Sequence, residues 1–184
     1  MEPDAHYLAR IAAAAATLGL PMEDIRARGL PVCGEAADLV TVETDLYGRA
    51  QSLAPAAAAA WWRMKAAAEA AGLRLHVVSG FRSFDRQVAI IRRKIDAGQA
   101  VSEILKVSAP PGYSEHHTGL AVDIATPGCP PFEEPFEGTQ AFAWLCTHAG
   151  TYGFHLSFPR DNSYGYAYEP WHWCYREKGG ASNV

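Results

Sequence analysis

Two short segments carry the side chains that could do chemistry. The segment 114–123 reads SEHHTGLAVD and places two imidazoles ahead of a carboxylate, Asp123. The segment 169–173 reads EPWHW and places the carboxylate of Glu169 three residues before the imidazole of His172. Two imidazoles and one carboxylate are a typical ligand set for a catalytic zinc ion, whose fourth position is left to water. A polar pair trapped in an aromatic core is the simpler interpretation of EPWHW.

Strand-like alternation indicates how the two segments could meet. In GLAVDI the apolar residues share one face, so Asp123 lies on the other face with small neighbours. In WHWCY the aromatic side chains point one way and His172 points the other way. If the two strands are neighbours in one sheet, His172 can meet Asp123 and an imidazole from the preceding loop. His116 and His117 are both available there, and the spacing does not select between them.

A hydrolytic zinc site needs two further groups, and the sequence offers a candidate for each. A base must take a proton from water, and Glu169 lies close to His172 in the chain. A cation must hold the charge that develops on a tetrahedral intermediate. Arg82, in SGFRS just before a predicted helix, is placed to reach a cleft. Spacing alone does not decide between a zinc site and a polar pair buried in an aromatic core.

The rest of the chain predicts the elements that position these residues. Apolar residues recur at helical spacing in several segments, and Ser83 is a typical N-cap for one of them. Shorter apolar or alternating segments between them are typical of strands. We therefore expect an α+β fold with a small, mostly antiparallel sheet. The expected helices cover 5–18, about 21–31, 55–71, 84–98 and 140–150, and the expected strands cover 73–80, 120–125, 152–158 and 171–175.

These elements predict a core domain with an addition at each end. We expect residues 1–45 to form an N-terminal helical appendage and residues 46–178 to form the core that carries the chemistry. Residues 179–184 are expected to be a disordered tail. The proline-rich segment 127–138 is expected to be a long surface loop without regular structure.

Length, composition and charge exclude several classes of protein. A chain of 184 residues can build one domain with a sizeable core, and its net charge of −4, with no basic stripe, argues against a nucleic-acid partner. The longest apolar run, 11–20, is too short to span a bilayer. The first ten residues lack the positively charged start of a signal peptide, so the default expectation is a cytoplasmic protein. We also expect a monomer. A trimmed sequence would instead allow a periplasmic or envelope location.

The cysteines are few and scattered, without a CxxC pair. They predict neither a disulfide scaffold nor a zinc ribbon. Buried thiols are favoured over a single disulfide bridge. The four residues are Cys33, Cys129, Cys146 and Cys174.

Three ordered motifs resemble those of a known family. SEHHTGLAVD fits S-x-H-x-x-G-x-A-x-D, and EPWHW fits E-P-W-H. SGFRSFDRQ, at 79–87, is similar to the S-G-[YF]-R-S-x-x-x-Q segment that precedes them. Together they resemble the VanY-type D-alanyl-D-alanine carboxypeptidases, zinc peptidases that share a core with lysostaphin and the hedgehog signalling domain. The resemblance runs from about residue 46 to 177.

The resemblance implies a role for each matched position. Glu169 would be the general base of a reaction on peptidoglycan stem peptides. Arg82 would hold a substrate carbonyl or carboxylate and steady the oxyanion. The implied ligands of Zn²⁺ are His116, Asp123 and His172. The implied substrate-binding residues are Arg82, Gln87 and Ser114. Arg160, in FPRDN, is a second candidate for the substrate carboxylate, although a solvated loop position is the simpler expectation.

Several activities remain compatible with these motifs. The leading hypothesis is a D,D-carboxypeptidase that removes the terminal D-alanine of a stem peptide. An L,D-carboxypeptidase acting on tetrapeptide stems is a close rival, and an endopeptidase is less favoured. A non-catalytic zinc-containing module that binds peptide or sugar belongs to a different class. A Cys/His hydrolase using Cys146 or Cys174 has no matched motif to support it.

Overall fold

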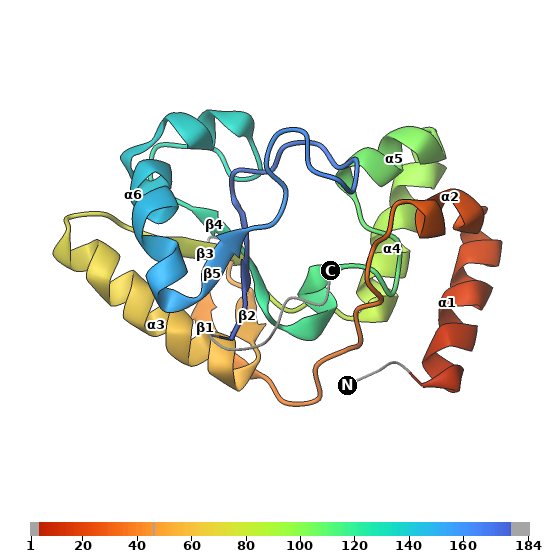
Figure 1. Ribbon diagram of the computed structural model, residues 1–184, viewed down its shortest axis with the longest axis horizontal. Helices are drawn as coiled ribbons and strands as arrows, with labels where there is room; N and C mark the ends of the chain where they lie inside the picture. The colour runs from red at the N-terminus through yellow and green to blue at the C-terminus, as the bar shows by residue number, and fades with distance from the viewer. Residues whose placement is uncertain (1–3, 46, 178–184) are drawn as a thin grey trace.

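The computed structural model describes residues 4–45 and 47–177, and it forms the expected α+β arrangement (Figure 1). Its main sheet has four strands in the order β3-β4-β6-β5, and every neighbouring pair is antiparallel. A second sheet pairs β1 with β2, also antiparallel. The strands are β1 Val40–Thr44, β2 Ala50–Leu53, β3 His76–Ser79, β4 Ala121–Ala125, β5 Phe154–Leu156 and β6 His172–Tyr175.

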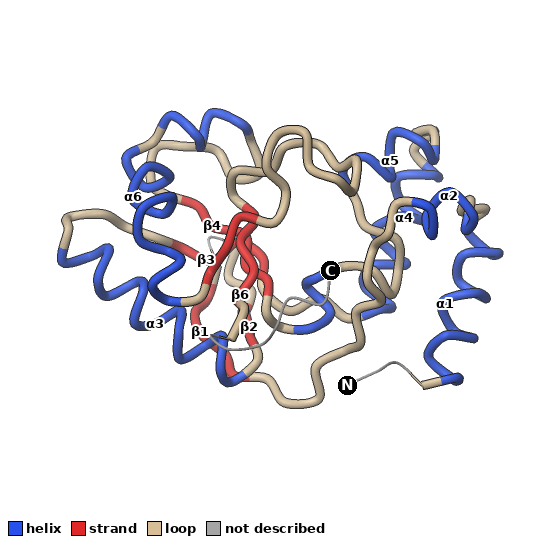
Figure 2. Tube along the Cα trace, in the orientation of Figure 1, coloured by secondary structure: helices blue, strands red, loops and turns tan. Residues whose placement is uncertain are grey.

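Helices lie on two sides of the strands (Figure 2). On one side are α3 and α6, and on the other are α1, α2, α4 and α5. Short 3₁₀ helices cover Glu115–Thr118 (η1), Glu134–Gly138 (η2) and Ala149–Tyr152 (η3). The α-helices are α1 Ala5–Leu18, α2 Met22–Ala27, α3 Pro55–Ala70, α4 Phe84–Asp96, α5 Val101–Val107 and α6 Gln140–His148.

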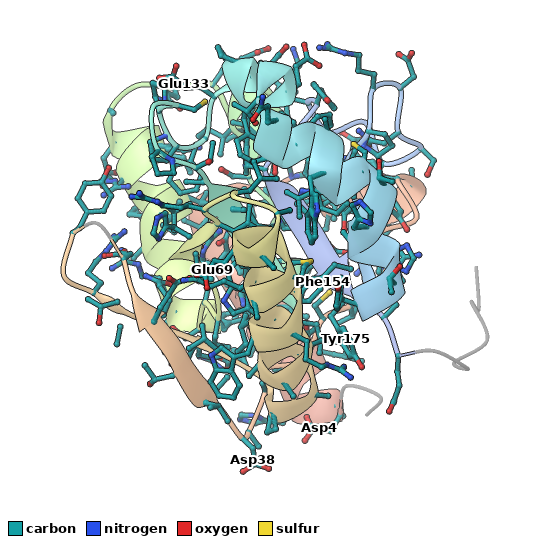
Figure 3. All side chains as sticks on the ribbon, turned by 90° about the vertical axis from the view of Figure 1, so that its left-hand side faces the viewer. Asp4, Asp38, Glu69, Glu133, Phe154 and Tyr175 are labelled. Carbon is teal, nitrogen blue, oxygen red and sulfur yellow. The ribbon has the colours of Figure 1, made fainter. Side chains whose placement is uncertain are left out.

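Each side of the strands has its own apolar cluster. The first lies between the main sheet, α3 and α6, and Trp61 of α3 is fully buried in it. Figure 3, viewed from that side, shows α3 in front of the sheet and labels Phe154 and Tyr175, whose rings meet edge to face at 5.6 Å. The second cluster joins α1, α4 and α5 around Phe84 and Ile91. The two clusters fix α4 and the sheet as separate supports for a cleft between them.

Local sequence explains where the helices begin. Asp4 accepts a hydrogen bond from the backbone N–H of Tyr7, which caps α1. Ser83 caps α4 as predicted, and Glu35 accepts from the N–H of Phe84 at 2.7 Å. Pro55 occupies the first turn of α3, where its missing N–H leaves no hydrogen bond unmade. None of the described helices combines the length and the apolar character needed to cross a membrane.

Some expectations need correction. Helix α5 was not predicted, and the proline-rich segment expected to lack regular structure contains η2. Pro135 sits in the first turn of η2, where a proline is tolerated, so proline content alone was a poor argument against a helix. The last strand begins at His172 rather than Trp171, and β3 begins at His76 rather than Leu73.

The N-terminal segment is joined to the rest of the fold by more than its chain connection. It contributes α1 and α2 as expected, but it also contributes β1, whose partner β2 lies beyond residue 45. The pairing therefore crosses the predicted domain boundary, and the boundary itself stays a prediction. The predicted tail, 179–184, lies outside the described residues.

Candidate active site

Three predicted ligands meet on the main sheet. Asp123 of β4 and His172 of β6 are paired residues of neighbouring antiparallel strands, as the zinc hypothesis required. His172 Nδ1 lies 2.9 Å from Asp123 Oδ1, and His116 Nε2 lies 3.1 Å from Asp123 Oδ2. One ligand atom from each of the three residues lies within 4.8 Å of the others, and all three residues are buried.

The backbone around His116 fixes which of its nitrogens faces Asp123. Its Nδ1 lies 2.7 Å from the carbonyl oxygen of Gly80, and because a carbonyl only accepts, Nδ1–H donates. The lone pair of Nε2 is then directed at Asp123. His116 belongs to η1, which ends at Gly119 with φ 66°, a left-handed conformation suited to glycine. A side chain at Gly119 would also collide with the backbone nitrogen of Ala54 at 2.8 Å.

His172 is oriented by a carboxylate that the sequence analysis did not identify. Glu115 Oε2 lies 2.9 Å from His172 Nε2, so Nε2–H donates outward and Nδ1 faces Asp123. The ring of Phe158 packs against the imidazole with centroids 4.7 Å apart. Glu115 directly precedes the ligand His116 in the chain. An acidic residue beside a metal-ligand motif was the available signal, because ligating histidines commonly donate their second N–H to a carboxylate.

The structure places His116, and not His117, in the triad. Both ring nitrogens of His117 are occupied: Nδ1 donates to the carbonyl of Arg82 at 2.6 Å, and Nε2 accepts from the N–H of Gly112 at 3.1 Å. Burial lowers the pKa of His117 to about 4, which keeps the ring neutral and suited to both contacts. His117 therefore fixes the loop that carries its neighbour.

The donor set fits a zinc ion. Two imidazole nitrogens and one carboxylate oxygen converge, and an acceptor outside the triad holds each imidazole in place. Burial lowers the pKa of His116, so its Nε2 lone pair is available. Burial opposes protonation of His172, but hydrogen bonds to Asp123 and Glu115 outweigh it and raise its pKa to about 10. The same carboxylates favour a bound divalent cation, which competes with that proton for Nδ1.

Glu169 lies beside the triad, as the EPWHW spacing predicted. Its Oε2 is 4.0 Å from His172 Nδ1, and its side chain is 16% exposed. Burial, with a smaller contribution from the Asp123 carboxylate, raises the pKa of Glu169 to about 7, although His172, Arg82 and Lys94 oppose the shift. The carboxylate is therefore close to the candidate metal position and open to the cleft.

Arg82 lies at the same centre, close to Asp123. Its Nη2 donates to Ser79 Oγ at 2.9 Å and lies 3.8 Å from Asp123 Oδ2. Its Nη1 donates to Gln87 Oε1 at 3.1 Å. Gln87 is fully buried, and its amide Nε2 donates to the carbonyl of Ala109. At this centre Gln87 therefore contacts Arg82 and holds its guanidinium in place.

These residues open into a cleft of about 460 Å³ between the sheet and α4. Arg82, Ser114, Glu115 and Glu169 line it together with the triad. The loop from β5 to β6 forms the opposite wall and arches towards α5, where the N–H of Ala167 donates to the carbonyl of Lys106 (Figure 1).

Other candidate residues lie elsewhere. Arg160 pairs with Glu137 at 2.9 Å and with Glu134 at 3.4 Å on the surface, outside the residues that line the cleft. All four cysteines are free, and two of them, Cys33 and Cys174, are buried. Burial raises the pKa of the Cys174 thiol well above its usual value, which disfavours the thiolate that a cysteine nucleophile needs. Cys146 is exposed and outside the cleft lining.

Most of the chain is similar to proteins of one family. Residues 50–178 match the family described as VanY: D-alanyl-D-alanine carboxypeptidase. The putative carboxypeptidase YodJ of Bacillus subtilis (strain 168) is 37% identical over 122 residues, covering 64% of this chain and 44% of YodJ. A D-alanyl-D-alanine carboxypeptidase of Enterococcus faecalis is 34% identical over 119 residues, covering 59% of this chain and 42% of that protein. The chain spans less than half the length of these curated relatives.

Solved structures share the fold. The LdcB LD-carboxypeptidase superposes with a TM-score of 0.72 and 35% identity, covering 81% of this chain and 72% of that chain. A second structure is a variant of the D,D-pentapeptidase VanY from a VanB-type vancomycin resistance cassette, solved in complex with Zn(II). It has a TM-score of 0.60 and 26% identity, covering 79% of this chain and 82% of that chain. With the family match and the buried His-Asp-His triad, these likenesses show that the chain belongs to the VanY D-alanyl-D-alanine carboxypeptidase family.

Proposed function

We propose that this protein is a zinc carboxypeptidase that removes the terminal D-alanine from peptidoglycan stem peptides. The observation that carries the proposal is the convergence, in one cleft, of a buried His-Asp-His triad, a carboxylate and a guanidinium. Each group matches a need of peptide hydrolysis: metal ligands, a base, and a cation for the developing negative charge.

In this proposal the metal ligands, Glu169 and Arg82 have different roles in the reaction. His116, Asp123 and His172 hold the ion, which when bound is a Lewis acid that polarises a carbonyl and lowers the pKa of water to about 7. Glu169 takes a proton from the attacking water on its carboxylate oxygen and passes it to the leaving amine. Arg82 binds the terminal carboxylate or the oxyanion through its guanidinium N–H groups, a geometry that suits planar anions.

Two further residues support this arrangement. Gln87 acts through Arg82, because its side chain donates to a backbone carbonyl on one side and accepts from the guanidinium on the other. Ser114 lines the cleft at the start of η1 and is a candidate contact for the substrate backbone. Residues 46–178 form the catalytic core in this proposal, and the protein acts as a monomer.

The choice between D,D and L,D substrates is the finer part of the proposal. The motifs suit both, and we propose D,D cleavage of pentapeptide stems because the matched family is described as D-alanyl-D-alanine carboxypeptidase. The higher TM-score to the LdcB LD-carboxypeptidase is a specific observation in favour of L,D cleavage of tetrapeptide stems, which is the second candidate.

A release assay separates these candidates. Zinc-loaded protein is incubated with pentapeptide and with tetrapeptide muropeptides, and free D-alanine is measured beside a chelator-treated control. Release from the pentapeptide alone supports the D,D activity, and release from the tetrapeptide alone supports the L,D activity. Zinc binding without release from either substrate would contradict the enzyme proposal and indicate a binding module.

A further inference from the structure

Helix α4 presents a line of cations to the cleft. Arg86, Ile90, Arg93 and Lys94 all line it, together with Arg82 just before the helix. Positions four and three residues apart lie on one face of a helix, so Arg86, Ile90 and Arg93 follow each other along the cleft wall. Two turns of helix separate the first arginine from the second, a length of about 10 Å. The two arginines therefore place positive charge along about 10 Å of the cleft wall.

The outer cations of this wall lack carboxylate partners within the described residues. Neither Arg86 nor Arg93 forms an ion pair with any residue in 4–45 or 47–177, and both are exposed. Lys94 donates to the neutral hydroxyl of Ser108 at 2.7 Å. Two of the carboxylates that line the cleft, Glu115 and Asp123, both contact His172 at the candidate metal site. The positive charge along α4 is thus available to a ligand.

The facing wall is aromatic. Phe132, Phe158, Tyr168 and Trp171 line the cleft, and the rings of Phe132 and Trp171 meet edge to face at 6.4 Å. The one acidic side chain that the facing loop adds to the lining is Glu169, at the metal end. A ligand lying between the two walls would therefore meet cations on one side and apolar surface on the other.

We propose that α4 selects stem peptides by charge, and that Arg86 and Arg93 bind free carboxylates on the part of the peptide that is retained after cleavage. This inference rests on the proposed function and specifies its substrate class: an acidic stem whose side-chain or α-carboxylates are free rather than converted to carboxamides. Arg86 and Arg93 act as specificity residues, remote from the reacting bond. Each exposed ion pair contributes little, so the expected preference from two arginines is modest, about three- to tenfold.

Binding measurements test the proposal without depending on turnover. Two synthetic pentapeptide stems are used that differ in one group, the α-carboxylate of D-glutamate or its carboxamide. Each is titrated into zinc-loaded Glu169→Gln protein, in which the candidate base is removed, and into the same protein carrying Arg86→Gln and Arg93→Gln. A further Arg63→Gln variant is the control, because Arg63 is an exposed arginine of α3 outside the cleft lining.

The expected result is a Kd about three- to tenfold lower for the free carboxylate, and loss of that preference in the Arg86→Gln/Arg93→Gln protein. The preference should shrink as salt rises from about 50 to 500 mM, because exposed charges are screened. The Arg63→Gln protein should keep the preference. Equal affinity of the Glu169→Gln protein for the two stems would overturn the inference. So would an unchanged preference after Arg86→Gln and Arg93→Gln are added. Either result would count against the inference even if the wild-type enzyme releases D-alanine. If the wild-type protein released no D-alanine but the preference for the free carboxylate were as expected, only the proposed function would be overturned.

Discussion

Asp123 and His172 face each other across the β4–β6 pair, with His172 Nδ1 2.9 Å from Asp123 Oδ1. The pairing places ligands that are 49 residues apart in the chain on one rigid surface. Each imidazole of the triad also forms a hydrogen bond through its second ring nitrogen. His172 donates to Glu115, and His116 donates to the carbonyl of Gly80. Site geometry held by such outer contacts can be tested by changing the contacts while leaving the ligands intact.

Removing the charge of Glu115 should weaken zinc binding. In Glu115→Gln the side chain keeps its size but loses the negative charge that favours a cation at His172. We expect zinc affinity to fall about tenfold, the lower end of the range for such outer contacts. The measurement is competition with a chromogenic chelator. Glu103→Gln is the control, because Glu103 is an exposed residue of α5 that pairs with Lys106 on the surface. Equal zinc affinity in the Glu115 and Glu103 variants would contradict this role.

A second test concerns the contacts behind His116. Gln51 of β2 accepts from the N–H of Gly80 at 2.9 Å, and the carbonyl of Gly80 accepts from His116. Gln51→Leu leaves that N–H without its partner, which costs roughly 1–3 kcal/mol when the group is buried. We expect a lower free energy of unfolding together with weaker zinc binding. Thr41→Ala, on the same hairpin, is the control. It should change the free energy of unfolding and the zinc affinity little, because the hydrogen bond between the Thr41 and Ser52 hydroxyls is exposed.

Acid should destabilise the protein in part through Asp45. Burial opposes ionisation of this residue, but hydrogen bonds from Arg49 and Tyr47 outweigh it and lower its folded pKa to about 2. The unfolded value is about 3.9, so its contribution is present above pH 4 and is lost as pH falls towards 2. Urea unfolding of chelator-treated protein at pH 5 and at pH 2.5 should show a smaller difference for Asp45→Asn than for wild type. An identical difference in both proteins would refute the prediction.

The N-terminal segment should influence substrate binding through Arg28. Its Nε donates to the carbonyl of Tyr164 at 2.6 Å and its Nη1 donates to that of Leu105 at 2.9 Å, which ties the cleft-wall loop to α5. In Arg28→Met we expect KM for a stem peptide to rise about three- to tenfold while kcat changes less, because the wall loosens but the triad does not. Arg26→Gln, at an exposed position of α2, should leave both values unchanged. A fall in kcat at constant KM would contradict this account.

The local signals in the sequence predicted much of the site and the elements that carry it. Alternation in GLAVDI and WHWCY predicted which strand face carries Asp123 and which carries His172, and Ser83 marked the start of α4. That the two strands are neighbours was an assumption, which the sheet order bears out. The choice between His116 and His117 needed the structure, because it depends on what each ring nitrogen contacts across the fold.

Other features depend on contacts between segments far apart in the chain. Gln51 reaches Gly80, and Arg28 reaches Tyr164 over 136 residues, so no local pattern marks either of them. Glu115 could have been predicted from its place beside a ligand. Helix α5 is seven residues long and lacks a side-chain cap, which leaves little local signal for it.

The most direct test of the account is a zinc titration of D-alanine release by wild type and Glu169→Gln. We predict that metal-free wild-type protein is inactive, and that its activity rises with added zinc and saturates at one equivalent per chain. Glu169→Gln should bind the same equivalent yet release D-alanine about 10²- to 10⁴-fold more slowly, as expected for the loss of a general base. Full activity without zinc, or near-wild-type release by zinc-loaded Glu169→Gln, would contradict the central claim.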